Sequence, residues 1–284
     1  MKFLMIGAHQ DDNEFMCGGI TAKLRAKGHE VRFLSLCNGS GGHHIMTPEE
    51  TVARRAGESA QVAKLLGIQY DVWSDMNDCS LEPTLENRRR LIRYIREYSP
   101  DVIITHREND YHADHRAAGT LMQDASYMLI VPHECPDVPA MDNTPLMLYY
   151  EDRFTNPPFE LALIVPIDDV IDTKIKIADI NVSQVYEWLP YTYHETPPTD
   201  KAERFEWLKG MNITADTTDE DLNNAPRPRG YAVRFARTAA RFRKDLLEVY
   251  GEEKGKKVRY AEAFAHCPYG APLTDEMKEF FKNL

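Results

Sequence analysis

Short apolar runs and longer amphipathic segments alternate along the first half of the chain. Four apolar runs have the length and continuity of buried parallel strands, at residues 2–8, 31–36, 69–74 and 101–106. The segments between them repeat apolar residues every three or four positions, as helices do, over residues 15–24, 48–66, 85–98 and 117–128. This alternation predicts an α/β fold with a mostly parallel sheet and helices on both faces.

The pattern of the second half is weaker. Two further strands are predicted at residues 146–150 and 160–167, and amphipathic helices at 168–189 and 232–250. No shift in composition marks a domain boundary. We therefore expect one domain over residues 1–284, with residues 190–258 as an insertion or lid within it.

The size and charge of the chain limit its class. It has 284 residues, enough for one large α/β domain. Its 34 Lys and Arg against 45 Asp and Glu give a net charge of −11, which repels nucleic acid and anionic membranes, so neither is expected as a partner. No apolar run reaches the roughly 18 residues of a membrane-spanning helix, and the N-terminal run is too short for a signal peptide. The five Cys are scattered and never in CxxC spacing, which favours reduced thiols in a cytoplasmic protein.

Two polar clusters directly follow predicted strands. The segment GAHQDDNEF places His9, Asp11 and Asp12 after the first strand, and the segment HRENDYHADHRAAG begins at His106, after the fourth. In α/β folds, ligands bind at the carboxyl ends of the parallel strands. Because like-charged carboxylates repel each other at such an edge, we expect a positive group to compensate them.

The types and spacing of these residues predict a metal site. His112 and His115 lie three positions apart, and with His9 and Asp12 they provide a His/Asp/His donor set. Three protein ligands and an open position for water are typical of catalytic zinc, although iron, cobalt and manganese accept the same donors. Asp11 beside the metal could take a proton from water as general base. The alternative for each segment alone is a helix-capping Asp beside a loop His.

These two segments resemble the signatures of the N-acetylglucosamine deacetylase family of PIG-L/LmbE type. The family's first-strand AHPDDE followed by GG is similar to AHQDDNEFMCGG here, and its later HxDH is similar to HADH at residues 112–115. The resemblance implies a zinc-dependent hydrolase, with one Zn²⁺ per chain, on a Rossmann-like three-layer α/β/α fold. It implies a small N-acetylated sugar or glycoconjugate as substrate, and it also implies a homo-oligomer.

Carried over by position, the resemblance assigns roles to individual residues. The implied zinc ligands are His9, Asp12 and His115. Asp11 is implied as general base. His112 would stabilise the oxyanion or protonate the leaving amine, and Asp114 would orient and polarise it.

Three further segments are similar to family motifs. RRAGESAQVAKLLG at residues 54–67 looks like the family's Arg-x-x-Glu helix, in which Arg55 would contact substrate. Two later segments also resemble the family, KIKIADINVSQ at residues 174–184 and YAEAF at residues 260–264. The resemblance is therefore dense up to about residue 130 and sparse beyond it.

Two positions depart from the family pattern. Gln10 stands where Pro is usual, which removes a fixed φ but no catalytic atom. Asn13 stands where many members have Glu, and Glu14 matches the members that carry Glu one place later. Neither departure changes a predicted metal ligand. They leave open which subfamily the chain resembles.

Three other functions compete with an N-deacetylase. A dinucleotide-dependent oxidoreductase needs GxGxxG in its first turn, and here only Gly7 precedes carboxylates that would repel a pyrophosphate. A zinc amidase acting on a different amide, such as a thiol conjugate or an antibiotic, would use the same residues. A non-catalytic metal-binding protein would not need Asp11 or His112, although both are present.

Two groups of ring-bearing residues have weaker interpretations. His43 and His44, on a Gly-rich loop, are expected to be exposed to solvent rather than to bind a sugar. A second group is expected to serve packing or a subunit contact rather than sugar stacking. It comprises Trp188, Tyr191, Tyr193 and His194.

Overall fold

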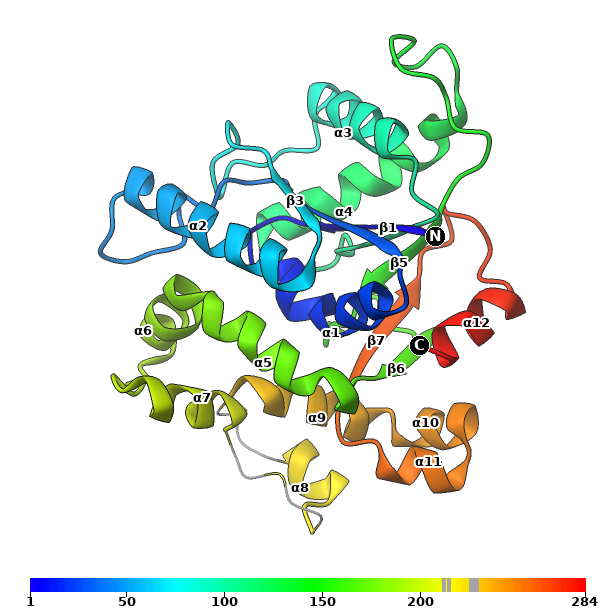
Figure 1. Cartoon of the computed structure of the whole chain (residues 1–284). Coiled ribbons are helices and arrows are strands. Elements are labelled where there is room, and N and C mark those ends of the chain that lie inside the picture. The colour runs from blue at the N-terminus through cyan, green and yellow to red at the C-terminus, as the bar shows by residue number, and fades with distance from the viewer. Residues whose placement is uncertain (211–212, 214–215, 225–229) are drawn as a thin grey trace.

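The computed structural model describes residues 1–210, 213, 216–224 and 230–284. A seven-stranded sheet of order β3-β2-β1-β4-β5-β7-β6 forms its centre (Figure 1). Its strands are β1 (Lys2–Gly7), β2 (Glu30–Ser35), β3 (Gln69–Val72), β4 (Val102–Thr105), β5 (Leu146–Tyr150), β6 (Leu163–Pro166) and β7 (Ala261–His266). Strands β1 to β5 pair in parallel, whereas β7 runs antiparallel to both β5 and β6. The prediction of a mostly parallel sheet is therefore confirmed.

Helices cover both faces of the sheet and make three layers (Figure 1). They are α1 (Asp12–Ala26), α2 (Pro48–Leu66), α3 (Leu85–Tyr98), α4 (Ala113–Ser126), α5 (Ile171–Ile180), α6 (Leu189–Tyr193), α7 (Lys201–Lys209), α8 (Asp219–Asn224), α9 (Tyr231–Arg241), α10 (Arg243–Tyr250), α11 (Glu252–Lys257) and α12 (Asp275–Lys282). Leu4 and Ile6 of β1 share a core with α3 and α4, and Phe3 and Met5 share one with α1 and α2. Alternate residues of β1 thus point to opposite, equally apolar faces. Among the described helices, none has the length and apolar character needed to cross a membrane.

The position of β1 creates the crevice in which a ligand can bind. The chain leaves β1 toward β2 and β3 on one side, then returns to place β4 on the other. Since these strands are parallel, the carboxyl ends of β1 and β4 lie together where the connections diverge. The two polar clusters of the sequence begin at those ends.

The boundaries of α2 follow from local sequence. Thr47 accepts the N–H of Glu50, and the Glu50 carboxylate accepts the N–H of Thr47, which completes a capping box before Pro48. At the other end Gly67 adopts a left-handed φ of 65°, where glycine avoids the Cβ penalty. Both ends agree with the predicted helix.

The predicted helix over residues 168–189 is broken. Helix α5 ends at Ile180, and a π-helical turn at Ser183–Trp188 precedes α6. Ser183 donates both its N–H and its hydroxyl to Glu58 of α2, at 2.9 and 2.6 Å, so a contact with another helix holds the backbone at this break. π-Helical turns of this kind occur mostly near functional sites.

Two further differences occur near the C-terminus. The predicted helix over residues 232–250 is divided at Phe242, which has φ −109° and ψ 30° and a buried side chain. Strand β7 was not predicted, because its sequence AEAFAH is short, rich in Ala and interrupted by Glu262. This strand nevertheless lies between β5 and β6 and joins them into one sheet.

A buried ion pair joins three distant segments behind the active edge. Helix α1 departs from helical φ and ψ at Cys17. The carboxylate of Glu262 accepts the N–H groups of Gly19 and Ile20 at 2.9 and 2.7 Å, and Lys174 donates to Glu262 and, at 3.0 Å, to the carbonyl of Phe15. The pair thereby satisfies backbone groups on both sides of the break in α1.

We expect Gly19→Ala to lower the free energy of unfolding by about 1–3 kcal/mol, because overpacking forces buried neighbours apart. A Cβ on Gly19 would lie 2.9 Å from Oε1 of Glu262 and 2.9 Å from Cγ2 of Ile167. The matched control is Gly57→Ala in α2, where a Cβ meets no atom within 4 Å and where Ala should stabilise by about 0.5–1 kcal/mol. Urea unfolding of both variants checks this, and equal stabilities would contradict it.

Candidate metal centre and active site

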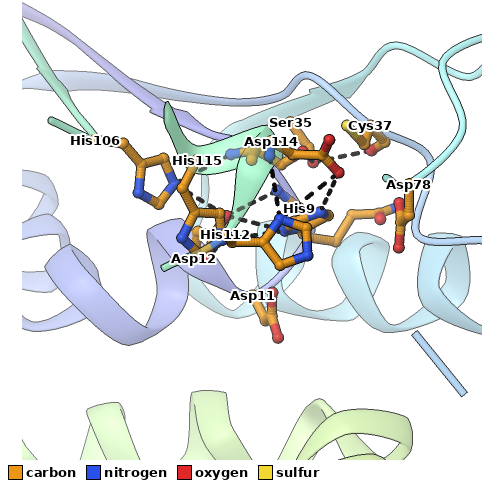
Figure 2. A network of polar contacts seen from close by, with 12 residues as sticks. His9, Asp11, Asp12, Ser35, Cys37, Asp78, His106, His112, Asp114 and His115 are labelled. Carbon is orange, nitrogen blue, oxygen red and sulfur yellow. Dashed lines mark hydrogen bonds and ion pairs between the residues drawn. The ribbon is translucent and has the colours of Figure 1, made fainter. Parts of the chain in front are cut away.

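Two short segments, one after each central strand, bring the predicted residues together (Figure 2). His9 follows β1, and Asp12 opens α1, where its Oδ2 accepts the backbone N–H of His9 at 2.8 Å. His112 is the N-cap residue of α4, and His115 lies three residues later, in the first turn of this helix. Because β1 and β4 are paired neighbours, the two segments face each other across the crevice.

Potential ligand atoms of three residues converge at this point. Nδ1 of His9 lies 3.3 Å from Nε2 of His115 and 3.6 Å from Oδ2 of Asp12. Nε2 of His115 lies 3.3 Å from Oδ1 of Asp12. A tetrahedral zinc ion with bonds of about 2.0–2.1 Å separates its ligand atoms by about 3.3 Å, so the donor set fits a small divalent ion. His106 and His112 each bring a nitrogen within 4.8 Å of two of these ligands.

The second ring nitrogen of each histidine lies beside a carboxylate. Nε2 of His9 is 3.0 Å from Oδ2 of Asp114, and Nδ1 of His115 is 3.0 Å from Oδ1 of Asp110. An imidazole N–H that donates to a carboxylate leaves its other nitrogen free to bind a metal. Asp110 lies five residues before His115 in the same polar segment. It is outside the HADH motif, so the motif assigns it no role.

The carboxylate of Asp114 forms a hydrogen bond with His9 and not with His112, which corrects the expected orientation of His112 by this carboxylate. Its Oδ2 lies 3.9 Å from Nδ1 of His112, which is beyond hydrogen-bond distance. Nδ1 of His112 instead accepts the backbone N–H of Asp114 at 3.2 Å, which leaves the proton of the neutral ring on Nε2. The carboxylate of Asp114 also accepts the N–H groups of Cys79 and Leu81, at 2.6 and 3.2 Å.

Negative charge dominates the centre. Burial by itself would lower the pKa of His9, but hydrogen bonds to Asp114 and Asp12 raise it to about 9. Burial also opposes the charged form of His115, yet Asp12 and Asp110 raise its pKa to about 10. Carboxylates that draw protons onto buried imidazoles favour positive charge in this place, which is the charge that a metal ion provides.

Asp11 lies beside this centre in an unusual conformation. Its φ of 134° belongs to a region that residues other than glycine rarely adopt, and such strain is concentrated at functional sites. Its Oδ1 lies 3.0 Å from Nη2 of Arg55. Burial raises the pKa of Asp11 to about 6, although the charge of Arg55 acts in the opposite direction. A carboxylate with a pKa near neutrality suits proton transfer.

Arg55 is buried behind the site. Besides its ion pair with Asp11, it donates to the backbone oxygen of Gln10. It does not belong to the described residues that line the cavity at the centre. The role that the structure supports for Arg55 is therefore to hold Asp11, and the implied contact with substrate has no geometric support here.

A cavity of about 670 Å³ opens at the centre, within the range of small-molecule sites. Asp11, Asp12, His106 and His115 line it. The rest of its wall comes largely from the second half of the chain, in which no residue is assigned a catalytic, substrate-binding or metal-binding role by the sequence motifs. These residues include Tyr150, Arg153, Tyr193, Trp207, Tyr231, Arg234 and Arg237.

A second depression of about 570 Å³ adjoins this cavity, with which it shares Pro190 and Glu195. The predicted exposure of His43 is wrong, because its side chain is buried and its Nε2 lies 3.0 Å from Oε2 of Glu187. His44 is exposed as predicted. Its ring stacks on that of Tyr191, with centroids 4.0 Å apart.

Comparisons with known proteins agree with this geometry. Residues 4–126 match the family described as PIG-L: GlcNAc-PI de-N-acetylase. A diacetylchitobiose deacetylase of Thermococcus kodakarensis is 28% identical over 201 residues, which cover 67% of this chain and 74% of that protein.

Solved structures show the same fold. The N,N'-diacetylchitobiose deacetylase from Pyrococcus horikoshii superposes with a TM-score of 0.64 and 22% identity, over 94% of this chain and 84% of that one. The 4-carboxy-2-hydroxymuconate hydratase from Pseudomonas putida superposes with a TM-score of 0.68 and 16% identity, over 97% and 99% of the two chains. The three-layer α/β/α prediction is thereby confirmed.

Proposed function

From the PIG-L family domain that residues 4–126 carry, we propose that this protein is a metal-dependent N-deacetylase acting on an N-acetylated sugar or glycoconjugate. The observation that carries the proposal is the convergence of His9, Asp12 and His115. Nδ1 of His9 and Nε2 of His115 lie 3.3 Å apart, and the two carboxylate oxygens of Asp12 lie 3.6 and 3.3 Å from these nitrogens, respectively. The deacetylase similar in sequence acts, by its name, on diacetylchitobiose, an N-acetylated sugar.

These three residues would hold one divalent ion, and zinc suits their donor chemistry. When bound, such an ion supplies Lewis acidity and makes water acidic enough to lose a proton near neutral pH. The hydrogen bonds from His9 to Asp114 and from His115 to Asp110 would fix both rings in the ligating tautomer.

Asp11 would move the protons of the reaction. Arg55 holds its Oδ1 at 3.0 Å, which leaves Oδ2 to take a proton from the attacking water. Water adds to the acetamide carbonyl carbon, the C–N bond breaks, and acetic acid leaves and loses its remaining proton to solvent as acetate. The proton on Asp11 then passes to the nitrogen of the released amine, so the carboxylate is restored.

His112 would stabilise the oxygen that becomes negative during attack. Since Nδ1 of His112 accepts the N–H of Asp114, the ring presents Nε2–H as a donor. Burial lowers the pKa of His112, and the neighbouring His9 and His115 lower it further. A neutral, positioned N–H is a suitable oxyanion donor.

We expect metal removal to abolish amine release. Purified protein should contain about one divalent metal per chain, and it should release amine from N-acetylglucosamine or N,N'-diacetylchitobiose until a chelator is added. His115→Ala should lose both metal and activity, because one of three ligands is gone. His133→Ala is the control, since this histidine is exposed on a loop.

Elemental analysis and a free-amine assay check this prediction together. Full metal content in His115→Ala would contradict the ligand assignment. Metal binding by the wild type without amine release from either sugar would contradict the sugar substrate and favour a zinc amidase that acts on a different amide.

A further inference from the structure

Three arginines face the active-site cavity without a partner among the described residues. Arg153 lies shortly after β5, and Arg234 and Arg237 lie on α9. All three line the same 670 Å³ cavity as the metal centre. The described residues give none of their guanidinium groups a hydrogen bond or ion pair, and Nε of Arg237 is buried without an acceptor. Arg234 has only a distant ring contact, 6.0 Å from the centre of Phe15.

The acids on the same wall are already paired. Glu151 accepts bonds from Thr238 and, at 2.9 Å, from Arg241. Asp152 forms a bidentate ion pair with Arg107, with N–O distances of 2.6 and 2.7 Å.

The other lining acids also have partners, with one exception. Glu262 is held by Lys174, and Asp11 by Arg55. Asp12 and Asp110 both lie beside His115. Among the described lining residues, Glu195 is the acid without such a pair. The cavity wall therefore contains three arginines without an ion pair and one carboxylate without an ion pair, among the described residues.

The three arginines act on one another. Arg234 and Arg237 are three positions apart, so they project from the same face of α9. Arg153 lies within electrostatic range of both. Burial lowers its pKa most, and the charges of Arg237, Arg241 and Arg234 lower it further, whereas the charge of Glu151 acts in the opposite direction. Like charges at this distance repel each other unless a negative ligand lies between them.

We propose that Arg153, Arg234 and Arg237 bind an anionic oxygen group on the part of the substrate that does not carry the acetyl group. The inference rests on the proposed deacetylase function and narrows its substrate to an N-acetylated sugar bearing a carboxylate or phosphoryl group. Guanidinium groups donate in pairs to both kinds of anion. With a net charge of −11, the protein as a whole repels anions. The three arginines make this wall of the cavity locally positive, so an anion can bind there.

The kinetic test compares charged and neutral substrates. The probes are N-acetylglucosamine, its 1-phosphate and 6-phosphate, and N-acetylmuramic acid. For wild type, kcat/KM for at least one charged probe should exceed that for the neutral sugar by at least about tenfold. In Arg234→Ala/Arg237→Ala this ratio should fall toward one. The control is Lys244→Ala/Lys254→Ala, which removes the same charge from exposed positions outside the cavity wall and should leave the ratio unchanged.

A binding measurement separates this inference from the deacetylase proposal. Glucosamine, its two phosphates and muramic acid, none of which carries an acetyl group to hydrolyse, are titrated by calorimetry into wild type and both double variants. The anion that wild type prefers identifies a phosphoryl or a carboxylate group. Equal affinity for neutral and charged ligands, or a preference that survives Arg234→Ala/Arg237→Ala, would overturn the anion site. A preference that depends on the arginines, without amine release from any probe by metal-loaded enzyme, would support the anion site and overturn the proposed reaction.

Discussion

Replacing Asp11 by Asn is expected to lower kcat by about 10²- to 10⁴-fold, the range attributed to general acid–base catalysis. The amide keeps the shape of the side chain and the hydrogen-bond acceptor for Arg55, but it cannot take a proton from water. Asn also tolerates the positive φ of this position better than most residues do. Metal content should be unchanged, because Asp11 is not among the proposed ligands.

The control for Asp11→Asn is Asp124→Asn, which changes an acid on the outer side of α4. Amine-release kinetics and elemental analysis are measured on both variants. A kcat for Asp11→Asn within a few-fold of wild type would refute its role as base. Loss of metal in parallel with activity would instead make Asp11 part of the metal-binding machinery.

Replacing Lys174 by Met should cost about 3–5 kcal/mol of unfolding free energy, because it leaves a charged partner buried and uncompensated. The side chains of Lys174 and Glu262 are 0% and 1% exposed. Burial lowers the pKa of Lys174, and Glu262 opposes this shift, so the charged form of Lys174 depends on its partner. Without the ammonium, the carboxylate retains, among the described residues, the N–H groups of Gly19 and Ile20 as donors.

The double variant Lys174→Met/Glu262→Gln should recover part of the loss, since Gln removes the buried charge and still accepts a backbone N–H. Lys176→Met is the matched control, because this lysine is exposed two positions away on the same helix and should change stability by at most about 0.5 kcal/mol. Denaturant unfolding measures all three. If Lys174→Met and Lys176→Met had the same free energy of unfolding, the expected contribution of the buried pair to stability would be contradicted.

The Lys174–Glu262 pair brings together three segments that resemble family motifs. The segment at 174–184 supplies Lys174, the segment at 260–264 supplies Glu262, and the glycine pair of the first motif supplies Gly19. All three meet at the Glu262 carboxylate. The pair supports α1, which carries Asp12 on its first turn.

The elements of the first half and the place of the candidate centre can be predicted from local patterns in the sequence. Apolar runs separated by amphipathic segments specify parallel strands, and local signals such as Thr47 and Gly67 set helix ends. Because the carboxyl ends of neighbouring parallel strands meet at one edge, His9, Asp12 and His115 could be expected together. Their chemistry is encoded within short segments, so no distant contact was needed to find it.

The rest of the cavity depends on contacts between segments that are distant in the sequence. Strand β7, which local hydrophobicity does not reveal, runs antiparallel between β5 and β6. Helix α9 packs against it and carries Arg234 and Arg237 to the cavity wall. The partner of Arg55 and the contact of Asp114 with His9 likewise join residues 44 or more positions apart. Such contacts depend on which surfaces pack together in three dimensions, and periodicity or spacing along one chain carries no signal for that choice.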